Sequence, residues 1–280
     1  MKEIVKYGNV INSLNFSSFS QVEMNLFFAL CGKTNDQGSN YIEIDYSELR
    51  KITHFRGRST TMLADYLDKM YTKLSQITGR FRSGNTRTQF ILFITWENNP
   101  DKEKLGIKVH PDYVYLLNNL QKEFTKFGLE EFVSLDSKYS KTLYRMLKQF
   151  KSTGKMVIND VEDFREKIGC PASYKNGVFM RDVVTPAVEE LKAVFKNLEC
   201  SPVYAMNKRG KPLDGLIFTF DKEVIQKKVY EGDDGSEEKE QPKEPAKKKP
   251  SSGKPNRFHN YEQRNTDYNK IIAENDPLTK

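Results

Sequence analysis

The sequence is poor in cysteine and histidine and has no long apolar run. Three cysteines are spread over 280 residues without a CxxC pair, which argues against a disulfide framework or a zinc ribbon and favours the reducing cytoplasm. The longest apolar stretch, from Phe90 to Trp96, includes Thr95 and is far shorter than the roughly 18–20 residues that span a membrane. Secreted disulfide-rich proteins and membrane-spanning proteins are therefore disfavoured.

Motifs for catalysis are also scarce. The three histidines (His54, His110 and His259) are isolated, with no HxH or HExxH pattern, so metal-dependent strand transfer by a histidine pair is disfavoured. No GxxxxGK(S/T) motif is present, which excludes a P-loop ATPase. We expect no cofactor and no bound metal.

The other reactive side chains have structural interpretations. Asp160, Glu162 and Asp163 could bind a metal, but they begin a predicted helix, where carboxylates cap free N–H groups and face the positive end of the dipole. Packing or turn positions are the favoured interpretation of all three cysteines, Cys31, Cys170 and Cys200.

The charge is unevenly distributed along the chain. The 45 Lys and Arg exceed the 38 Asp and Glu, giving a net charge of +7. Only 10 of the basic residues and 11 of the acidic residues follow residue 230, so residues 1–230 carry +8 and the remainder carries −1. A basic folded region favours polyanionic partners, chiefly nucleic acid or an anionic membrane surface.

The last fifty residues differ in composition from the rest. Residues 231–256 hold four prolines and almost no apolar side chains, so they cannot bury enough surface to offset chain entropy, and we predict a disordered linker. Residues 257–280 regain aromatic side chains but are too few to fold alone. We interpret them as a docking segment for a partner protein, with a frayed terminus as the alternative. The candidate docking residues are Phe258, Tyr261, Arg264 and Tyr268.

The first half of the preceding region shows a mixed pattern of helices and strands. Ser20 and Ser59 are typical N-caps, and polar turns separate the later strands. The predicted elements are helix 20–32, strand 41–45, helices 46–52 and 59–74, and strands 77–82, 89–97 and 105–109.

The second half repeats this order. Asp136 or Ser137 caps one predicted helix, Asp160 caps the next, and Pro186 is expected to break or kink the longest. The predicted elements are helix 137–151, strand 155–158, helices 160–167 and 177–198, and a hairpin of strands 203–206 and 213–220, with a helix and a turn in 110–128 between the halves.

Helix, strand, helix, helix and hairpin is the order of a winged helix. The sequence therefore predicts an α+β fold with two tandem winged-helix domains, residues 1–125 and 126–230, followed by the linker (231–256) and the short segment (257–280). One larger α+β domain with the same order of elements is the alternative.

Cations gather at three kinds of place that suit nucleic acid. Four of them are spaced by three or four residues along helix 137–151, and no acidic residue from 137 to 159 offsets them. Others crowd two hairpin turns, interpreted as equivalent in the two halves, where they would meet phosphates or the minor groove. Each long helix also begins with cations. Solvated faces and ordinary caps are the alternative interpretation. The candidate backbone or minor-groove contacts are Arg56, Arg58, Arg80, Arg82, Arg87, Lys138, Lys141, Arg145, Lys148, Lys208, Arg209 and Lys211.

Several short motifs, taken in order, resemble one known family. They are NVIN (9–12), SKYSKTLY (137–144), KQFK (148–151), FREKIG (164–169) and FMRDVVTPAVEEL (179–191), the last preceded by Tyr174. Over residues 1–222 the chain resembles the RepA/RepE-type plasmid replication initiators, the iteron-binding Rep proteins of theta-replicating plasmids. The segment from Phe258 to Arg264 also resembles a short C-terminal motif of replication proteins from Gram-positive plasmids and phages.

The resemblance implies a function and a binding mode. By this resemblance, the second winged helix reads repeated origin sites (iterons) in the major groove. The first winged helix adds backbone contacts and a dimer interface. A monomer opens the origin, a dimer can repress its own gene, and a host initiator, helicase or primase is a further partner. The resemblance places base contacts on Lys175, Asn176 and Arg181.

We therefore expect a cytoplasmic, non-enzymatic initiator that binds duplex DNA and no membrane. The alternatives are a transcriptional regulator with the same folds and, less favoured, a nickase or nuclease that uses tyrosine and acidic residues.

Overall fold

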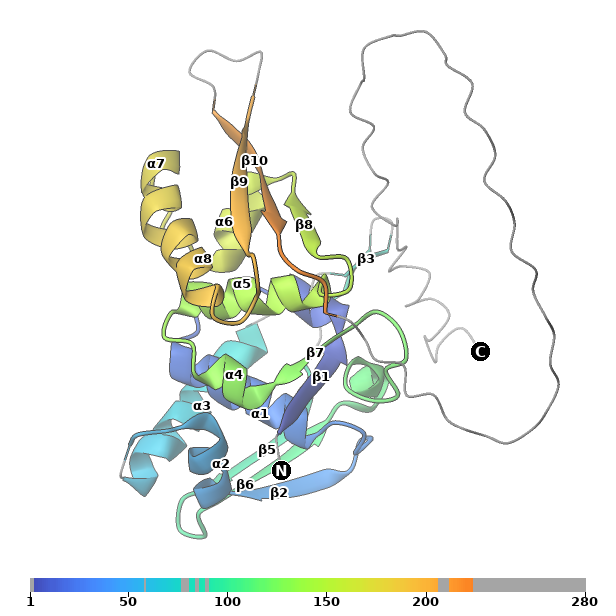
Figure 1. Ribbon diagram of the computed structural model, residues 1–280. Helices are drawn as coiled ribbons and strands as arrows, with labels where there is room; N and C mark the ends of the chain where they lie inside the picture. Colours follow the sequence, from blue (N-terminus) through green and yellow to red (C-terminus); the bar gives the residue numbers. More distant parts are fainter. Residues whose placement is uncertain are drawn as a thin grey trace, which may run out of the picture.

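The computed structural model describes residues 3–57, 59–76, 81–83, 86–88, 91–205 and 212–223. Figure 1 shows two groups of helices and strands, one above the other, with helix α5 lying between them. The predicted linker and docking segment, with residues Phe258, Tyr261, Arg264 and Tyr268, lie outside the described residues.

The first group begins with a strand that the sequence did not indicate. It then follows the predicted order of helix, strand, two helices and strands. Its elements are β1 (Ile4–Gly8), η1 (Asn9–Ser13), α1 (Gln21–Lys33), β2 (Tyr41–Asp45), α2 (Tyr46–Thr53), α3 (Thr60–Gln76), β3 (Phe81–Ser83), β4 (Thr86–Thr88), β5 (Phe93–Asn99) and β6 (Lys104–Val109).

The rest of the described chain forms a connection and then the second group. Its elements are η2 (Pro111–Leu116), β7 (Phe124–Gly128), α4 (Leu129–Val133), α5 (Lys138–Gln149), β8 (Lys155–Ile158), α6 (Val161–Ile168), α7 (Asn176–Phe179), η3 (Met180–Val184), α8 (Thr185–Leu191), β9 (Glu199–Tyr204) and β10 (Leu213–Thr219).

Side-chain caps set the starts of three helices where the sequence predicted them. Ser20 and Glu23 form a reciprocal capping box at α1, which satisfies free N–H groups of the first turn. Ser137 accepts a hydrogen bond at the start of α5, and Asp160 accepts one from the Asp163 N–H at the start of α6. The capping interpretation of Asp160 is therefore confirmed.

The sheet topology is the same in the two groups. In the first, β6 pairs with both β2 and β5, giving the order β2-β6-β5. In the second, β10 pairs with both β8 and β9, giving β8-β10-β9. The strand between the first two helices thus pairs with the second strand of the following hairpin each time. The repeated order seen in the sequence is a repeated topology.

The predicted long helix 177–198 is shorter and irregular. It runs continuously from Asn176 to Leu191 as α7, η3 and α8, and η3 is a π-helical turn. There the Thr185 N–H donates to the Met180 carbonyl five residues back. Pro186 follows directly; its ring crowds the carbonyl four residues earlier, and it has no N–H to donate. The π turn directly before Pro186 accommodates the missing N–H and the bulk of the ring.

The prediction for 110–128 was wrong in its second part. The segment holds the short 3₁₀-helix η2 and then the strand β7, which pairs with β1 in antiparallel register from Ile4 opposite Gly128 to Gly8 opposite Phe124. The pairing joins residues more than a hundred positions apart, so no local pattern indicates it. The expected domain boundary at residue 125 falls inside β7 and stays a prediction.

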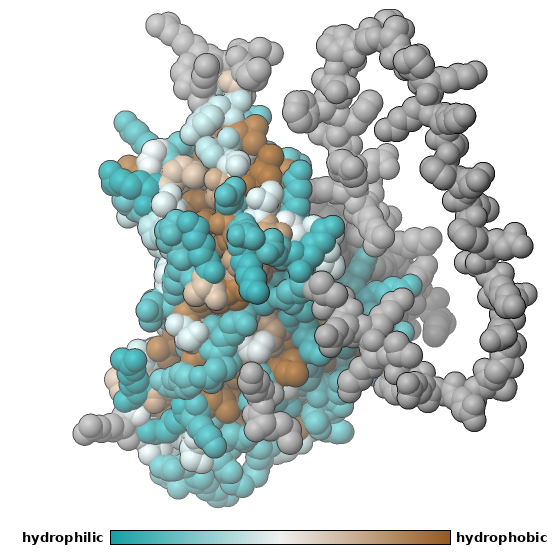
Figure 2. All heavy atoms as spheres, viewed as in Figure 1, coloured by the Kyte–Doolittle hydropathy of each residue, from teal (hydrophilic) through white to brown (hydrophobic). Residues whose placement is uncertain are grey.

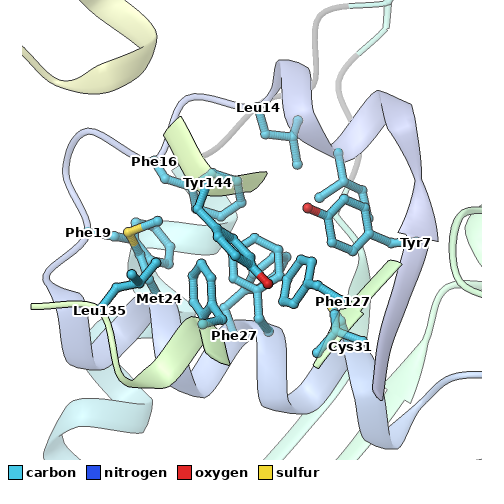
Figure 3. Packing of buried hydrophobic residues seen from close by; sticks show 14 of the residues in the cluster. Tyr7, Leu14, Phe16, Phe19, Met24, Phe27, Cys31, Phe127, Leu135 and Tyr144 are labelled. Atoms are coloured by element: carbon cyan, nitrogen blue, oxygen red, sulfur yellow. The ribbon is translucent and has the colours of Figure 1, made fainter. Parts of the chain in front are cut away.

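An aromatic core fills the space between α1, β7 and α5 (Figure 3). The Phe28 ring centroid lies 4.9 Å from that of Phe132 and 5.9 Å from that of Phe127. Tyr144 on α5 packs 5.2 Å from Phe127 and 5.8 Å from Phe195 of the second group. Buried aromatic contacts of this kind contribute beyond their area, so α5 ties the two groups into one packed interior.

The surface of the described residues is mostly polar. On the face in Figure 2, hydrophilic residues cover the lower part, and apolar surface is broken into separate patches. Exposed apolar side chains include Val203 and Tyr204 on the hairpin strand β9. No helix within the described ranges is both long and apolar enough to cross a membrane.

Candidate nucleic-acid interface

The free end of α7 and the β9–β10 hairpin lie at the same end of the molecule, away from α1 to α3 (Figure 1). Lys175 is the N-cap residue of α7, and its side chain is exposed. Asn176 begins the helix and is partly buried, and Arg181 is exposed in the π turn. The three predicted base-reading residues therefore lie in the first part of one helix, at the end of the molecule that also holds the hairpin.

Arg181 is held by its neighbour in sequence. Its Nε and Nη2 lie 2.6 Å and 2.8 Å from the two carboxylate oxygens of Asp182, a two-point ion pair at the surface. Each group keeps the other charged, since Asp182 raises the pKa of Arg181 and Arg181 lowers the pKa of Asp182. The pair leaves Nη1 without a partner among the described residues, so the guanidinium keeps a donor for an outside acceptor.

Arg165 on α6 supports the start of α7, a role that the sequence did not reveal. Its Nη1 donates to Asn176 Oδ1 at 3.0 Å, and its Nη2 donates to the Tyr174 carbonyl. Its guanidinium carbon lies 5.0 Å from the centre of the Phe179 ring. A signal was present: Val161, Phe164, Arg165 and Ile168 are the buried residues of α6, so Arg165 occupies an apolar-face position at helical spacing.

The predicted cation stripe on α5 faces the interior rather than solvent. Lys141 and Arg145 are fully buried and Lys148 is 6% exposed. The prediction that these three residues contact phosphates is wrong for this structure, because each is already bound within the protein. Lys138, the fourth member, is partly exposed, with its Nζ 5.3 Å from the Tyr139 ring centre, and it stays a candidate.

Two of the buried cations hold carbonyl groups at the ends of short helices. Arg145 Nη1 and Nη2 donate to the carbonyls of Ile11 and Leu14, both at 3.1 Å, where η1 ends. Lys141 Nζ donates to the carbonyls of Phe132 and Val133 at the end of α4. Helix C-terminal carbonyls attract cations. Burial still lowers the pKa of Lys141 to about 8, since charge is disfavoured away from water.

Remote acidic residues pair with Lys148. Its Nζ lies 3.0 Å from Glu131 before α5 and 2.7 Å from Glu223 after β10. Residues 137–159, on which the prediction of an exposed stripe rested, contain no acid. The partners come from outside that stretch, so the local absence of acidic residues did not mean an unpaired charge.

The two basic hairpin turns are not equivalent. The hairpin that corresponds to β9–β10 in pairing is β5–β6, whose turn lies at 100–103. Arg82 and Arg87 instead occupy paired backbone positions in the separate two-stranded β3–β4 hairpin. The prediction that the two basic turns occupy equivalent positions is therefore wrong. That these cations contact DNA stays a prediction.

The remaining candidates are placed only in part. Arg56, before α3, is exposed. The candidate contacts that lie outside the described residues are Arg58, Arg80, Lys208, Arg209 and Lys211.

The histidines and cysteines of the described residues have structural roles. His54 ends α2 in the left-handed conformation, and the His110 ring caps η2. Burial raises the pKa of Cys200 to about 12 and raises that of the fully buried Cys31 as well, which opposes formation of a reactive thiolate. In this part of the chain, no cluster of His, Cys, Asp or Glu could hold a metal ion.

Family models match both groups of elements. Residues 4–148 match the model described as "Initiator Replication protein, WH1", and residues 160–220 match "Initiator Rep protein, WH2". The chain belongs to the initiator replication protein family. The two winged-helix domains and the resemblance to replication initiators inferred from the sequence are thereby confirmed. Neither description of this initiator family names an enzymatic activity.

A relative and a solved structure agree with this family. The "Probable replication protein rep" of Bifidobacterium longum (strain NCC 2705) is 30% identical over 225 residues, which are 79% of this chain and 74% of that protein. The crystal structure of the Pi initiator protein in complex with iteron DNA matches 80% of this chain and 99% of that one, with a TM-score of 0.58 and 17% identity. At that identity, the likeness to the Pi initiator is one of fold.

Proposed function

We propose that this chain starts plasmid replication by binding repeated origin sequences, iterons, as duplex DNA in the cytoplasm, with no catalytic step of its own. The observation that carries the proposal is the match of both winged-helix domains to the initiator replication family. The Pi initiator, which has the same fold, is bound to iteron DNA in its crystal structure.

In this proposal the second domain reads the sequence. Lys175, Asn176 and Arg181 approach base edges in the major groove from the start of α7 and from η3. Arginine and lysine suit guanine there, and the asparagine amide brings a hydrogen-bonding group to a base edge. The placement of these residues in one helix, at the same end of the molecule as the β9–β10 hairpin, supports this mode.

Backbone contacts would fix the register of the protein on the duplex. Arg56 and Lys138, both with exposed or partly exposed side chains, are the described candidates. Arg58, Arg80, Arg82, Arg87, Lys208, Arg209 and Lys211 remain candidates from the sequence.

Self-association and host contacts belong to the same proposal. We propose that monomers occupy iterons, that a homodimer represses the gene, and that residues 257–280 contact a host initiator, helicase or primase. The composition of the segment, with aromatic side chains after a polar, proline-containing stretch, supports the last point.

A plasmid maintenance assay tests the initiator function. The gene and a few hundred flanking base pairs are placed on a selectable DNA circle with no other origin, and transformants are counted. The proposal expects replication that is lost when an early stop codon ends the gene and regained when the protein is supplied from a second plasmid. A circle that never replicates, although the protein binds its flanking repeats, would favour the transcriptional regulator.

A further inference from the structure

The side-chain amide of Asn176 has its orientation set by Arg165. A guanidinium has five N–H donors and no acceptor, so only the amide oxygen of Asn176 can face it. Arg165 Nη1 lies 3.0 Å from Asn176 Oδ1. The opposite amide orientation would place N–H groups against N–H groups, so the amide nitrogen Nδ2 must lie on the side away from Nη1.

Arg165 is itself firmly held. It is 7% exposed, and its guanidinium lies over the Phe179 ring at 5.0 Å. Its Nη2 donates to the carbonyl of Tyr174, the residue two before Asn176. The exposed carboxylate of Glu162 approaches its Nε at 3.7 Å. Because the guanidinium is packed and bonded on several sides, it forms a fixed support rather than a mobile surface group.

The Asn176 amide thus has its oxygen turned toward the protein and its nitrogen turned away from Arg165. Oδ1 is engaged with the buried cation, whereas Nδ2 has no hydrogen-bond partner among the described residues. Reading adenine through two hydrogen bonds requires Oδ1 to accept from the adenine amino group while Nδ2 donates to N7. Guanine O6 and N7 and thymine O4 are acceptors that a donor alone satisfies, whereas adenine sets an amino donor beside N7 and needs an outward-facing Oδ1 as well.

We propose that Arg165 is a positioning residue that turns Asn176 into a hydrogen-bond donor toward DNA, so that Asn176 selects guanine or thymine rather than adenine. The inference rests on the proposed function, since it requires that this helix end meets base edges. It assigns the choice of base to a buried residue that does not touch DNA.

The test is a selection from a pool of randomised duplexes, made with the full-length chain. The unaltered protein first gives an enriched motif. Asn176→Asp, at the first helical position where a carboxylate is well tolerated, then keeps the contact with Arg165 but replaces the outward donor with an acceptor. At one position of the motif, the preference should change from guanine or thymine to cytosine, whose amino group is a donor.

Arg165→Met is the companion variant, because methionine fills similar space without a donor. Releasing Oδ1 should raise adenine at that same position by about tenfold or more while other positions keep their preference. Thermal unfolding and binding to a scrambled duplex show whether each variant is folded. If Arg165→Met does not fold, Asn176→Asp decides alone.

The outcomes separate the inference from the function on which it rests. Adenine or cytosine at the Asn176-dependent position of the unaltered protein would overturn the inference. So would an Asn176→Asp variant that loses affinity for all duplexes alike or changes no position. If the unaltered protein enriches no motif, the proposed sequence-specific function fails, and the inference fails with it.

Discussion

The cations of this chain act according to what surrounds each side chain. Arg145 is fully buried against carbonyl groups, Arg165 is buried against an amide and a ring, and Arg181 is exposed beside a carboxylate. The first holds the interior together, the second orients a neighbour, and only the third is available to an outside partner. The same residue type thus has three roles within one domain pair.

Replacement of Arg145 tests its role in the interior. In Arg145→Met, the buried Leu14 carbonyl loses its donor, at about 1–3 kcal/mol for an unsatisfied group. The Ile11 carbonyl keeps the Leu14 N–H but loses a hydrogen bond to a charged group, worth about 1.5–3 kcal/mol. We expect the free energy of unfolding to fall by roughly 2–5 kcal/mol in urea titrations of the full-length chain. Lys192→Met, which removes an exposed ion pair with Glu189, is the matched control and should change little.

The same variant distinguishes the interior role from a phosphate contact. Where Arg145→Met remains folded, the dependence of DNA affinity on salt concentration should equal that of the unaltered protein. A slope reduced by about one unit would instead indicate a lost phosphate contact and would contradict the assignment of Arg145 to the interior.

Elements in this fold are placed by local signals at their ends and by remote contacts along their faces. α6 shows both: Asp160 caps its start, Gly169 ends it at a φ of 75° that glycine adopts without strain, and Arg165 joins it to α7. A well-formed α6 is therefore a condition for a well-placed α7.

Loss of the α6 cap should weaken this element measurably. Asp160→Ala removes the acceptor for the Asp163 N–H, which lies 3.0 Å from Asp160 Oδ1. We expect the free energy of unfolding to fall by about 0.5–2 kcal/mol, measured by chemical denaturation. Glu162→Ala, in the same first turn but 84% exposed in its side chain, should lose clearly less. Equal losses would mean that negative charge near the helix start, rather than the cap, stabilises α6.

Features set by local signals could be predicted from the sequence, whereas features set by remote contacts could not. Caps such as Ser20 and Asp160, and the order of helices and strands, were predicted because the signals lie within a few residues of one another. The sequence did not predict that β1 pairs with β7. It also did not predict that Glu131 and Glu223 pair with Lys148. Both features depend on contacts across the whole fold. The π turn before Pro186 was anticipated only as a kink.

The candidate site was predicted in the same partial way. Lys175, Asn176 and Arg181 lie in the first part of one continuous helix, and their contact with bases stays a prediction. Lys141, Arg145 and Lys148 were misread as surface groups because a cation spacing of three and four residues describes a helix face without saying what covers it.

At the scale of the whole molecule, α5 joins the two winged-helix domains. Its aromatic side chain Tyr144 contacts rings of both groups, and its Lys148 reaches Glu223 beyond the last strand. The described chain ends at this ion pair. The ion pair makes Glu223 part of the packed fold.

Truncation tests the separate role of the last fifty residues. A chain that stops after Lys228 keeps Glu223 and should bind origin repeats as tightly as the full chain, yet it should maintain its plasmid poorly if residues 257–280 dock a host factor. Normal plasmid maintenance would contradict the docking proposal. A chain that stops after Phe220 also loses Glu223, the partner of Lys148. It serves as the control for a truncation that enters the fold, and its free energy of unfolding should be lower than that of the chain ending at Lys228.

The most direct test of the account is a comparison of affinities for two duplexes. One carries the repeats that flank the gene, and the other has the same base composition in scrambled order; both are titrated with the full-length chain and with Arg181→Ala at one salt concentration. The account predicts that the unaltered protein binds the repeats at least roughly a thousandfold more tightly than the scrambled duplex. Arg181→Ala should lose about 10- to 100-fold on the repeats and little on the scrambled DNA. Equal affinity of the unaltered protein for the two duplexes would contradict the claim that this chain reads a DNA sequence.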